Sequence, residues 1–157
     1  NILKGNDVNP KWMELIRRSR KLLDDTVAGN GDAVARAIEE IRKEQYAPGY
    51  YNNELALRAV IKFAYIVTFG QYVKIEEMPS GKGIADVVFI PKRLTKLPAM
   101  VVELKWNKTS GGAIRQIKDK GYPEVLKDYG GEILLIGINY DERTKIHTCE
   151  IEKGLVR

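Results

Sequence analysis

An apolar stretch that contains two charges, Val101-Val102-Glu103-Leu104-Lys105-Trp106, constrains the fold of this chain more than any other feature. Its β-branched and aromatic residues predict a strand. Because side chains alternate along a strand, Glu103 and Lys105 project from one face and Leu104 from the other. On an exposed edge strand such a charged pair is an ordinary feature that contributes only about a few tenths of a kcal/mol. The apolar neighbours favour a strand covered on both sides, where paired charges need a functional reason.

A second predicted strand, residues 84–90, carries one carboxylate, Asp86, among apolar side chains. An Asp inside a strand is costly unless it is bound or paired. Two carboxylates and an ammonium group on neighbouring strands make a poor core but suit a metal-dependent hydrolytic site. Asp86, Glu103 and the backbone carbonyl of Leu104 offer the hard oxygen ligands that Mg²⁺ prefers, with Mn²⁺ as a substitute. Lys105 would position the attacking water or stabilise developing charge. Zinc is disfavoured because no cysteine or histidine cluster accompanies these residues.

The order of the predicted elements indicates a mixed α/β sandwich. Helices are predicted over residues 10–28, 32–45 and 53–69, with Asp32 as the N-cap of the second helix. Strands are predicted over residues 71–79, 84–90, 99–106, 132–140 and 145–151. A further helix begins near residue 109 and is interrupted near Gly121. The pattern after the first two helices is therefore α-β-β-β-α-β-β.

Positive charge gathers around the predicted strand that carries Glu103. The 157-residue chain has a net charge of +5, but residues 92–120 alone hold eight basic and two acidic side chains, a net +6. A polyanionic substrate such as a nucleic acid requires surroundings of this kind. Solvated lysines on loops and on a helix face explain the same pattern without a substrate, and charge alone does not decide between the two.

Length and composition suit one folded domain outside the membrane. No apolar run approaches the ~20 residues of a membrane helix. Cys149 is the only cysteine, which excludes an internal disulfide and favours a cytoplasmic location. His147 and Cys149 alternate on the last predicted strand without the partners of a metal site, so we interpret both as structural. The chain begins at Asn1 rather than at methionine, which favours a domain cut from a longer polypeptide.

Five sequence elements occur in a telling order: Glu54 on a predicted helix, Gly-x-Ala-Asp ending at Asp86, Val-Glu-Leu-Lys-Trp around Glu103, and then Gln116 and Tyr122. In this order and spacing they resemble the PD-(D/E)xK nuclease superfamily, whose sites pair an Asp on one strand with Glu-x-Lys on the next. The proline of that name is missing, since Ala85 precedes Asp86. The resemblance covers residues 50–153 and is closest to the RecB-like and Holliday-junction-resolvase-like branches. Within them the chain looks most like the nuclease domain that ends uncharacterised bacterial AAA-ATPase-like proteins.

This resemblance implies a restriction-endonuclease-like α-β-β-β-α-β core with a mixed central sheet, preceded by two extra N-terminal helices. Residues 1–49 would then form a helical extension or linker region, and residues 50–157 the nuclease-like domain. The resemblance also implies Mg²⁺ as cofactor, DNA as substrate, and an ATPase-like domain upstream in the full-length chain. A homodimer is expected if both strands of a duplex are cut.

The helix residues of the pattern have ordinary explanations as well. The resemblance implies that Glu54 binds the metal or its water, and that Gln116 and Tyr122 orient the water or hold a phosphate. Glu54 also shares a helical stripe with Arg58 and Lys62, where ion pairs explain it without catalysis. Gln116 and Tyr122 are equally well explained as a polar helix residue and a packed aromatic.

The leading hypothesis is therefore a Mg²⁺-dependent nuclease that hydrolyses phosphodiester bonds in DNA. The alternative is a catalytically silent nucleic-acid-binding or regulatory module of a larger ATPase-like protein. The sequence does not separate the two, because a complete set of site residues does not demonstrate turnover.

Overall fold

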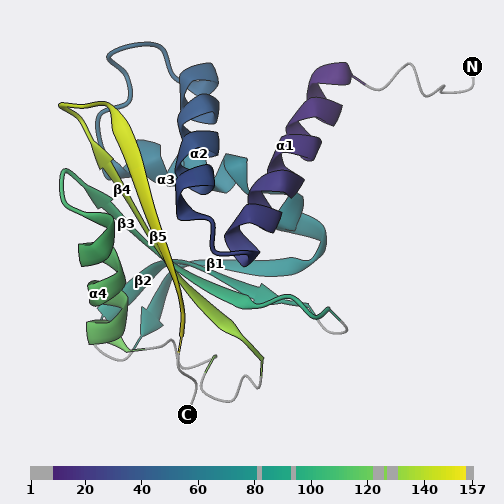
Figure 1. Cartoon of the computed structure of the whole chain (residues 1–157), viewed down its shortest axis with the longest axis vertical. Helices are drawn as coiled ribbons and strands as arrows, with labels where there is room; N and C mark the ends of the chain where they lie inside the picture. Colours follow the sequence, from purple (N-terminus) through teal and green to yellow (C-terminus); the bar gives the residue numbers. More distant parts are fainter. Residues whose placement is uncertain (1–8, 81–82, 93–94, 122–125, 127–130, 155–157) are drawn as a thin grey trace, which may run out of the picture.

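A five-stranded sheet forms the centre of the molecule, in a computed structural model that describes residues 9–80, 83–92, 95–121, 126 and 131–154 (Figure 1). The strands are β1 (Tyr72–Ser80), β2 (Gly83–Pro91), β3 (Ala99–Trp106), β4 (Ile133–Asp141) and β5 (Ile146–Lys153). The helices are α1 (Pro10–Val27), α2 (Gly31–Gln45), α3 (Glu54–Ala64), α4 (Ser110–Lys120) and the short 3₁₀ helix η2 (Ile66–Gly70). Within the described ranges, no helix is both long and apolar enough to span a membrane.

The strand order and directions match the fold expected from the sequence. The strands lie in the order β1-β2-β3-β4-β5, with β3 and β4 parallel and the other described neighbours antiparallel. A parallel pair needs a crossover connection, and the segment with α4 provides it. The mixed α/β class, the mixed central sheet and the two preceding helices are thus confirmed.

Two hydrophobic clusters cover the opposite faces of this sheet. One joins α1, α2 and α3 to one face through strand residues such as Val102. The other joins α4 to the opposite face, where Ile117 packs with Val101 and its neighbours (Figure 1). Glu103 and Lys105 alternate in phase with Val101, so their side chains project toward the α4 face. Strand β3 therefore places the charged side chains of Glu103 and Lys105 on the α4 side of the sheet.

Helix α2 begins one residue earlier than predicted, at Gly31, with Asn30 in the N-cap position. The prediction of Asp32 as the N-cap is therefore wrong. A Cβ on Gly31 would lie 2.4 Å from the carbonyl oxygen of Cys149, so β5 approaches the helix start too closely for a larger residue. Asp32 lies in the first turn of α2, where a carboxylate favours the positive end of the helix dipole.

The long helix predicted over residues 53–69 is divided in the structure. Helix α3 ends at Ala64, and η2 follows after Tyr65. The hydroxyl of Ser19 on α1 donates to the carbonyl of Ala64 at 2.7 Å and accepts the amide of Val67 at 3.0 Å. A side chain from 45 residues away therefore satisfies the backbone groups at this break, which explains why local periodicity did not reveal it.

The N-terminal helices share a core with the sheet, and a buried polar cluster joins α2 to β5. Leu22 of α1 and Ile38 of α2 belong to the same hydrophobic cluster as the strand residues of that face. His147 on β5 pairs through Nδ1 with Glu39 at 2.6 Å and through Nε2 with the Tyr51 hydroxyl at 2.8 Å. His147 thus has two polar partners that the sequence did not suggest, and they tie α2 and the segment before α3 to the last strand.

We predict that Gly137→Ala destabilises the protein because α4 rests directly on this position of β4. A Cβ there would lie 2.5 Å from the Ser110 carbonyl oxygen and 2.9 Å from the Ala113 Cβ. Overpacking of this kind costs about 1–3 kcal/mol, measurable as a shift in the urea midpoint. Gly70→Ala is the matched control, since a Cβ at Gly70 meets no atom within 4 Å. Equal stability of the two variants would contradict the close contact of α4 with β4.

Candidate active site

The ladder between β2 and β3 ends at the pair Val87–Val102, immediately before Asp86. At that point the Oδ2 atom of Asp86 accepts the backbone amide of Leu104 at 2.8 Å. A side-chain carboxylate therefore takes the place of a backbone acceptor where the two strands part. The amide and carbonyl of a strand residue face the same side, so the Leu104 carbonyl is also directed toward β2. We call Asp86, Glu103, Leu104 and Lys105 the β2–β3 site.

Glu103 brings a carboxylate into the interior of the molecule. The residue is only 3% exposed. Lys120, the last residue of α4, donates to both of its carboxylate oxygens at 3.0 Å. Burial and the nearby charge of Asp86 raise the pKa of Glu103 to about 7, while Lys120 and Lys105 oppose that rise. Asp86, Lys105 and Lys120 therefore all lie near enough to act on the same carboxylate.

A basic side chain from α3, on the face of the sheet opposite to α4, pairs with Asp86. The Arg58 guanidinium on α3 lies 3.4 Å from Oδ1 of Asp86, and both side chains are about four-fifths buried. Helices α3 and α4 belong to hydrophobic clusters on different faces. The two carboxylates of the β2–β3 site are thus met by basic side chains that arrive from opposite faces.

The structure places the other predicted site residues less closely. Glu54 is the exposed first residue of α3, a helix capped by the side chain of Asn53. Among the described side chains, no three of His, Cys, Asp or Glu gather closely enough to hold a metal ion, so Glu54 does not complete a triad with Asp86 and Glu103. Gln116 is half-buried on α4, one turn before Lys120. Tyr122 lies outside the described residues.

Sequence reasoning missed two residues of this arrangement, Arg58 and Lys120. Arg58 follows Glu54 by four residues on α3, and Lys120 follows Gln116 by four residues on α4. Residues four apart lie on the same stripe of a helix. This spacing could have revealed both residues. If Glu54 and Gln116 are predicted to face the site, the residues one helical turn later are candidates to face it as well.

The basic segment around the site is partly neutralised. Lys120 pairs with Glu103, and Lys118 pairs with Glu152 of β5 at 3.2 Å. Lys108 and Arg115 are exposed on and beside α4. The positive charge of residues 92–120 is therefore divided between ion pairs within the protein and exposed side chains such as Lys108.

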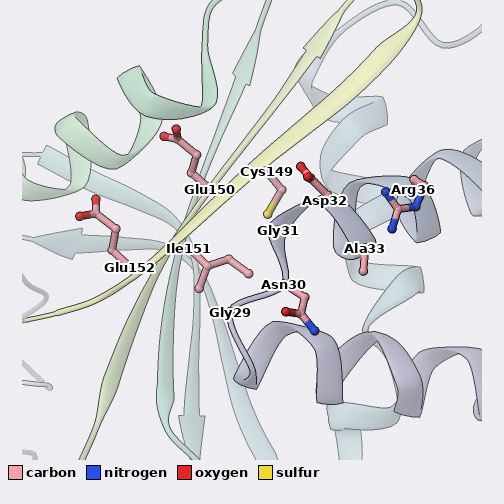
Figure 2. Close-up of a pocket in the computed structure, with 10 residues that line it drawn as sticks. All are labelled: Gly29, Asn30, Gly31, Asp32, Ala33, Arg36, Cys149, Glu150, Ile151 and Glu152. Atoms are coloured by element: carbon pink, nitrogen blue, oxygen red, sulfur yellow. The ribbon is translucent and has the colours of Figure 1, made fainter.

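A broad surface depression lies elsewhere, between the α1–α2 connection and β5 (Figure 2). Glu150 and Glu152 point to one side of β5, whereas Cys149 and Ile151 point to the other, toward the start of α2 (Figure 2). The ten residues that line it include none of the predicted site residues. The depression and the two neighbouring carboxylates thus lie at different places on the molecule. The carboxylates favour the β2–β3 site as the candidate active site.

Residues 52–150 match the family model of the PD-(D/E)XK nuclease superfamily. The chain belongs to this superfamily. The match covers more than half of the chain and spans α3, β1 to β4, α4 and most of β5, including every residue of the β2–β3 site. Superfamily members are generally nucleases, which hydrolyse phosphodiester bonds. No curated protein shows a significant sequence match to this chain.

We predict that, without metal, the free energy of unfolding of this protein falls as Glu103 ionises. Native Glu103 keeps its proton up to about pH 7, whereas the unfolded side chain loses it near 4.5. The free energy of unfolding should therefore decrease between these pH values, by roughly 1–3 kcal/mol, relative to Glu103→Gln. Urea unfolding of both proteins at about pH 5 and about pH 8 measures the difference. Parallel pH profiles for the two proteins would show that Glu103 is not destabilised by its charge.

Proposed function

We propose that this protein is a Mg²⁺-dependent nuclease that cleaves DNA at the β2–β3 site. The observation that carries the proposal is the approach of two carboxylates, Asp86 and Glu103, where the β2–β3 ladder ends. Their repulsion contributes to the raised pKa of Glu103. Membership of a nuclease superfamily supports the hydrolytic interpretation of these two groups.

The donor set fits a hard divalent cation. Asp86, Glu103 and the carbonyl of Leu104 would hold it through oxygen atoms, which Mg²⁺ and Mn²⁺ prefer. A cation between the two carboxylates would also relieve their repulsion. Glu54 stays a predicted further ligand. In the structure it is exposed at the start of α3. When bound, Mg²⁺ supplies Lewis acidity and lowers the pKa of a coordinated water.

Lys105 is the basic residue that β3 itself places beside the ligands. It projects from the same face of β3 as Glu103 and lowers the pKa of that carboxyl by its charge. Its ammonium group would donate to the attacking water and to the phosphate oxygens as negative charge develops there. Gln116, half-buried on α4, would orient the same water, and Tyr122 stays a predicted contact for the water or a phosphate.

The exposed Lys108, two residues beyond the end of β3, would hold the substrate backbone next to this site. DNA as substrate, a homodimer for cleavage of both duplex strands, and an upstream ATPase-like domain are the finer parts of the proposal. They depend on the resemblance to RecB-like and resolvase-like nucleases.

The alternative, a silent nucleic-acid-binding module, has one observation in its favour. Lys120 contacts both oxygens of Glu103, which is how a carboxylate is satisfied without a metal. A module of this kind would bind nucleic acid with a steep salt dependence and would not cleave it.

We predict divalent-ion-dependent cleavage by the wild-type protein across single-stranded, duplex and branched DNA, with matched RNA substrates for comparison. Asp86→Asn and Lys105→Ala should each reduce the rate by about two orders of magnitude or more, because each removes a charged group from the reacting centre. Asp86→Asn keeps a side-chain acceptor for the Leu104 amide, so its fold is expected to persist.

Lys108→Ala is the matched control, an exposed lysine three residues along the chain from Lys105. It should weaken substrate binding modestly and leave the cleavage rate at saturation close to that of wild type. Equal activity of wild type and Asp86→Asn, or binding without cleavage by every protein, would contradict the proposed function.

A further inference from the structure

The contact between Lys120 and Glu103 occupies the atoms that a metal ion would need. The ammonium lies 3.0 Å from each carboxylate oxygen of Glu103, and the side chains are 16% and 4% exposed. A buried carboxylate must be paired in this way, or bound to a cation of another kind. Lys120 therefore provides for Glu103 what a divalent ion would provide.

The place of Lys120 in the fold holds its charge near the site. It is the last residue of α4, where the negative end of the helix dipole favours a cation. Gly121 follows with a φ of 80° and ends the helix. Upstream, Ile114 and Ile117 pack α4 against the sheet. The backbone of Lys120 is thus positioned by the core, while its side chain spans the distance to β3.

The charges around the site resist a further cation. With both carboxylates ionised, two negative and three positive side chains gather there, a net +1: Asp86, Glu103, Arg58, Lys105 and Lys120. A divalent ion added to this set would meet net repulsion. Removal of Lys120 from Glu103 would free two oxygen atoms and bring the remaining net charge from +1 to zero.

We propose that Lys120 is an internal competitor for the divalent ion, and that the ion binds Glu103 only when Lys120 leaves that carboxylate. The inference rests on the proposed function, in which Asp86 and Glu103 hold the metal. The displaced ammonium stays tethered at the end of α4 beside the site, where a phosphate of the nucleic acid can accept it. Substrate and metal therefore support each other's binding, because a phosphate that holds Lys120 frees Glu103 for the ion.

The test is a calorimetric titration of Mn²⁺ into the full chain without nucleic acid, at a pH above the pKa of Glu103. Lys120→Gln should bind Mn²⁺ about tenfold more tightly than wild type, because the competing charge is removed. Lys120→Arg keeps that charge and should bind about as weakly as wild type. Lys118→Gln is the matched control on the same helix, since its partner is Glu152, and should leave the affinity unchanged.

Asp86→Asn separates failure of this inference from failure of the proposed function. If wild type binds Mn²⁺, Asp86→Asn loses it, and Lys120→Gln equals wild type or binds more weakly, the competitor role alone is overturned. If Asp86→Asn binds as wild type does, or if neither wild type nor Lys120→Gln binds, the metal site itself is wrong and the inference fails with it.

A measurement on the wild-type protein covers the case in which Lys120→Gln does not fold. Ammonium signals of ¹⁵N-labelled lysine are seen when the group is held in a buried ion pair. The Lys120 signal should be present in the metal-free protein and should disappear on saturation with diamagnetic Mg²⁺. Persistence of that signal at saturating Mg²⁺ would overturn the proposal.

Discussion

The burial of Glu103 beside Asp86 is the constraint on which the rest of the site depends. A carboxylate that is 3% exposed cannot keep its charge at low cost, and the charge of Asp86 increases that cost. Basic side chains from two helices pair with these carboxylates. Arg58 of α3 pairs with Asp86, and Lys120 of α4 pairs with Glu103. A divalent ion would satisfy the same pair of carboxylates with one group, and we therefore propose that the ion pairs are one state of a metal site.

The sheet makes this arrangement by interrupting its own ladder. The pairing of β2 with β3 ends at Val87 and Val102, and the carboxylate of Asp86 then accepts the Leu104 amide. The crossover from β3 to β4 places α4 against the face to which Glu103 projects, and the first turn of α4 lies close to Gly137 of β4. The geometry of the β2–β3 site is thus a consequence of ordinary sheet and helix packing.

The sequence predicted those parts of the structure that depend on local pattern. The span of β3 agrees with the prediction, and simple alternation places Glu103 and Lys105 on one face. The break after Ala64 was not predictable locally, because it depends on Ser19 of α1. The partners of His147, Glu39 and Tyr51, are likewise distant along the chain.

The same reasoning explains what was missed at the site. Arg58 and Lys120 look like surface residues in the sequence, and only the placement of α3 and α4 brings them to the carboxylates. Glu54, which the superfamily pattern implied as a ligand, remains at the exposed start of α3. The site residues on the strands could therefore be predicted from local sequence pattern. Those on the helices, Arg58 and Lys120, could not, because their place at the site depends on tertiary packing.

Whether Asp86 and Glu103 share a divalent ion can be seen in an anomalous diffraction map from crystals soaked in Mn²⁺. We expect a manganese peak between the two carboxylates, with the Lys120 side chain moved away from Glu103. A map with no peak at those carboxylates, or with its peak in the depression between the α1–α2 connection and β5, would contradict it.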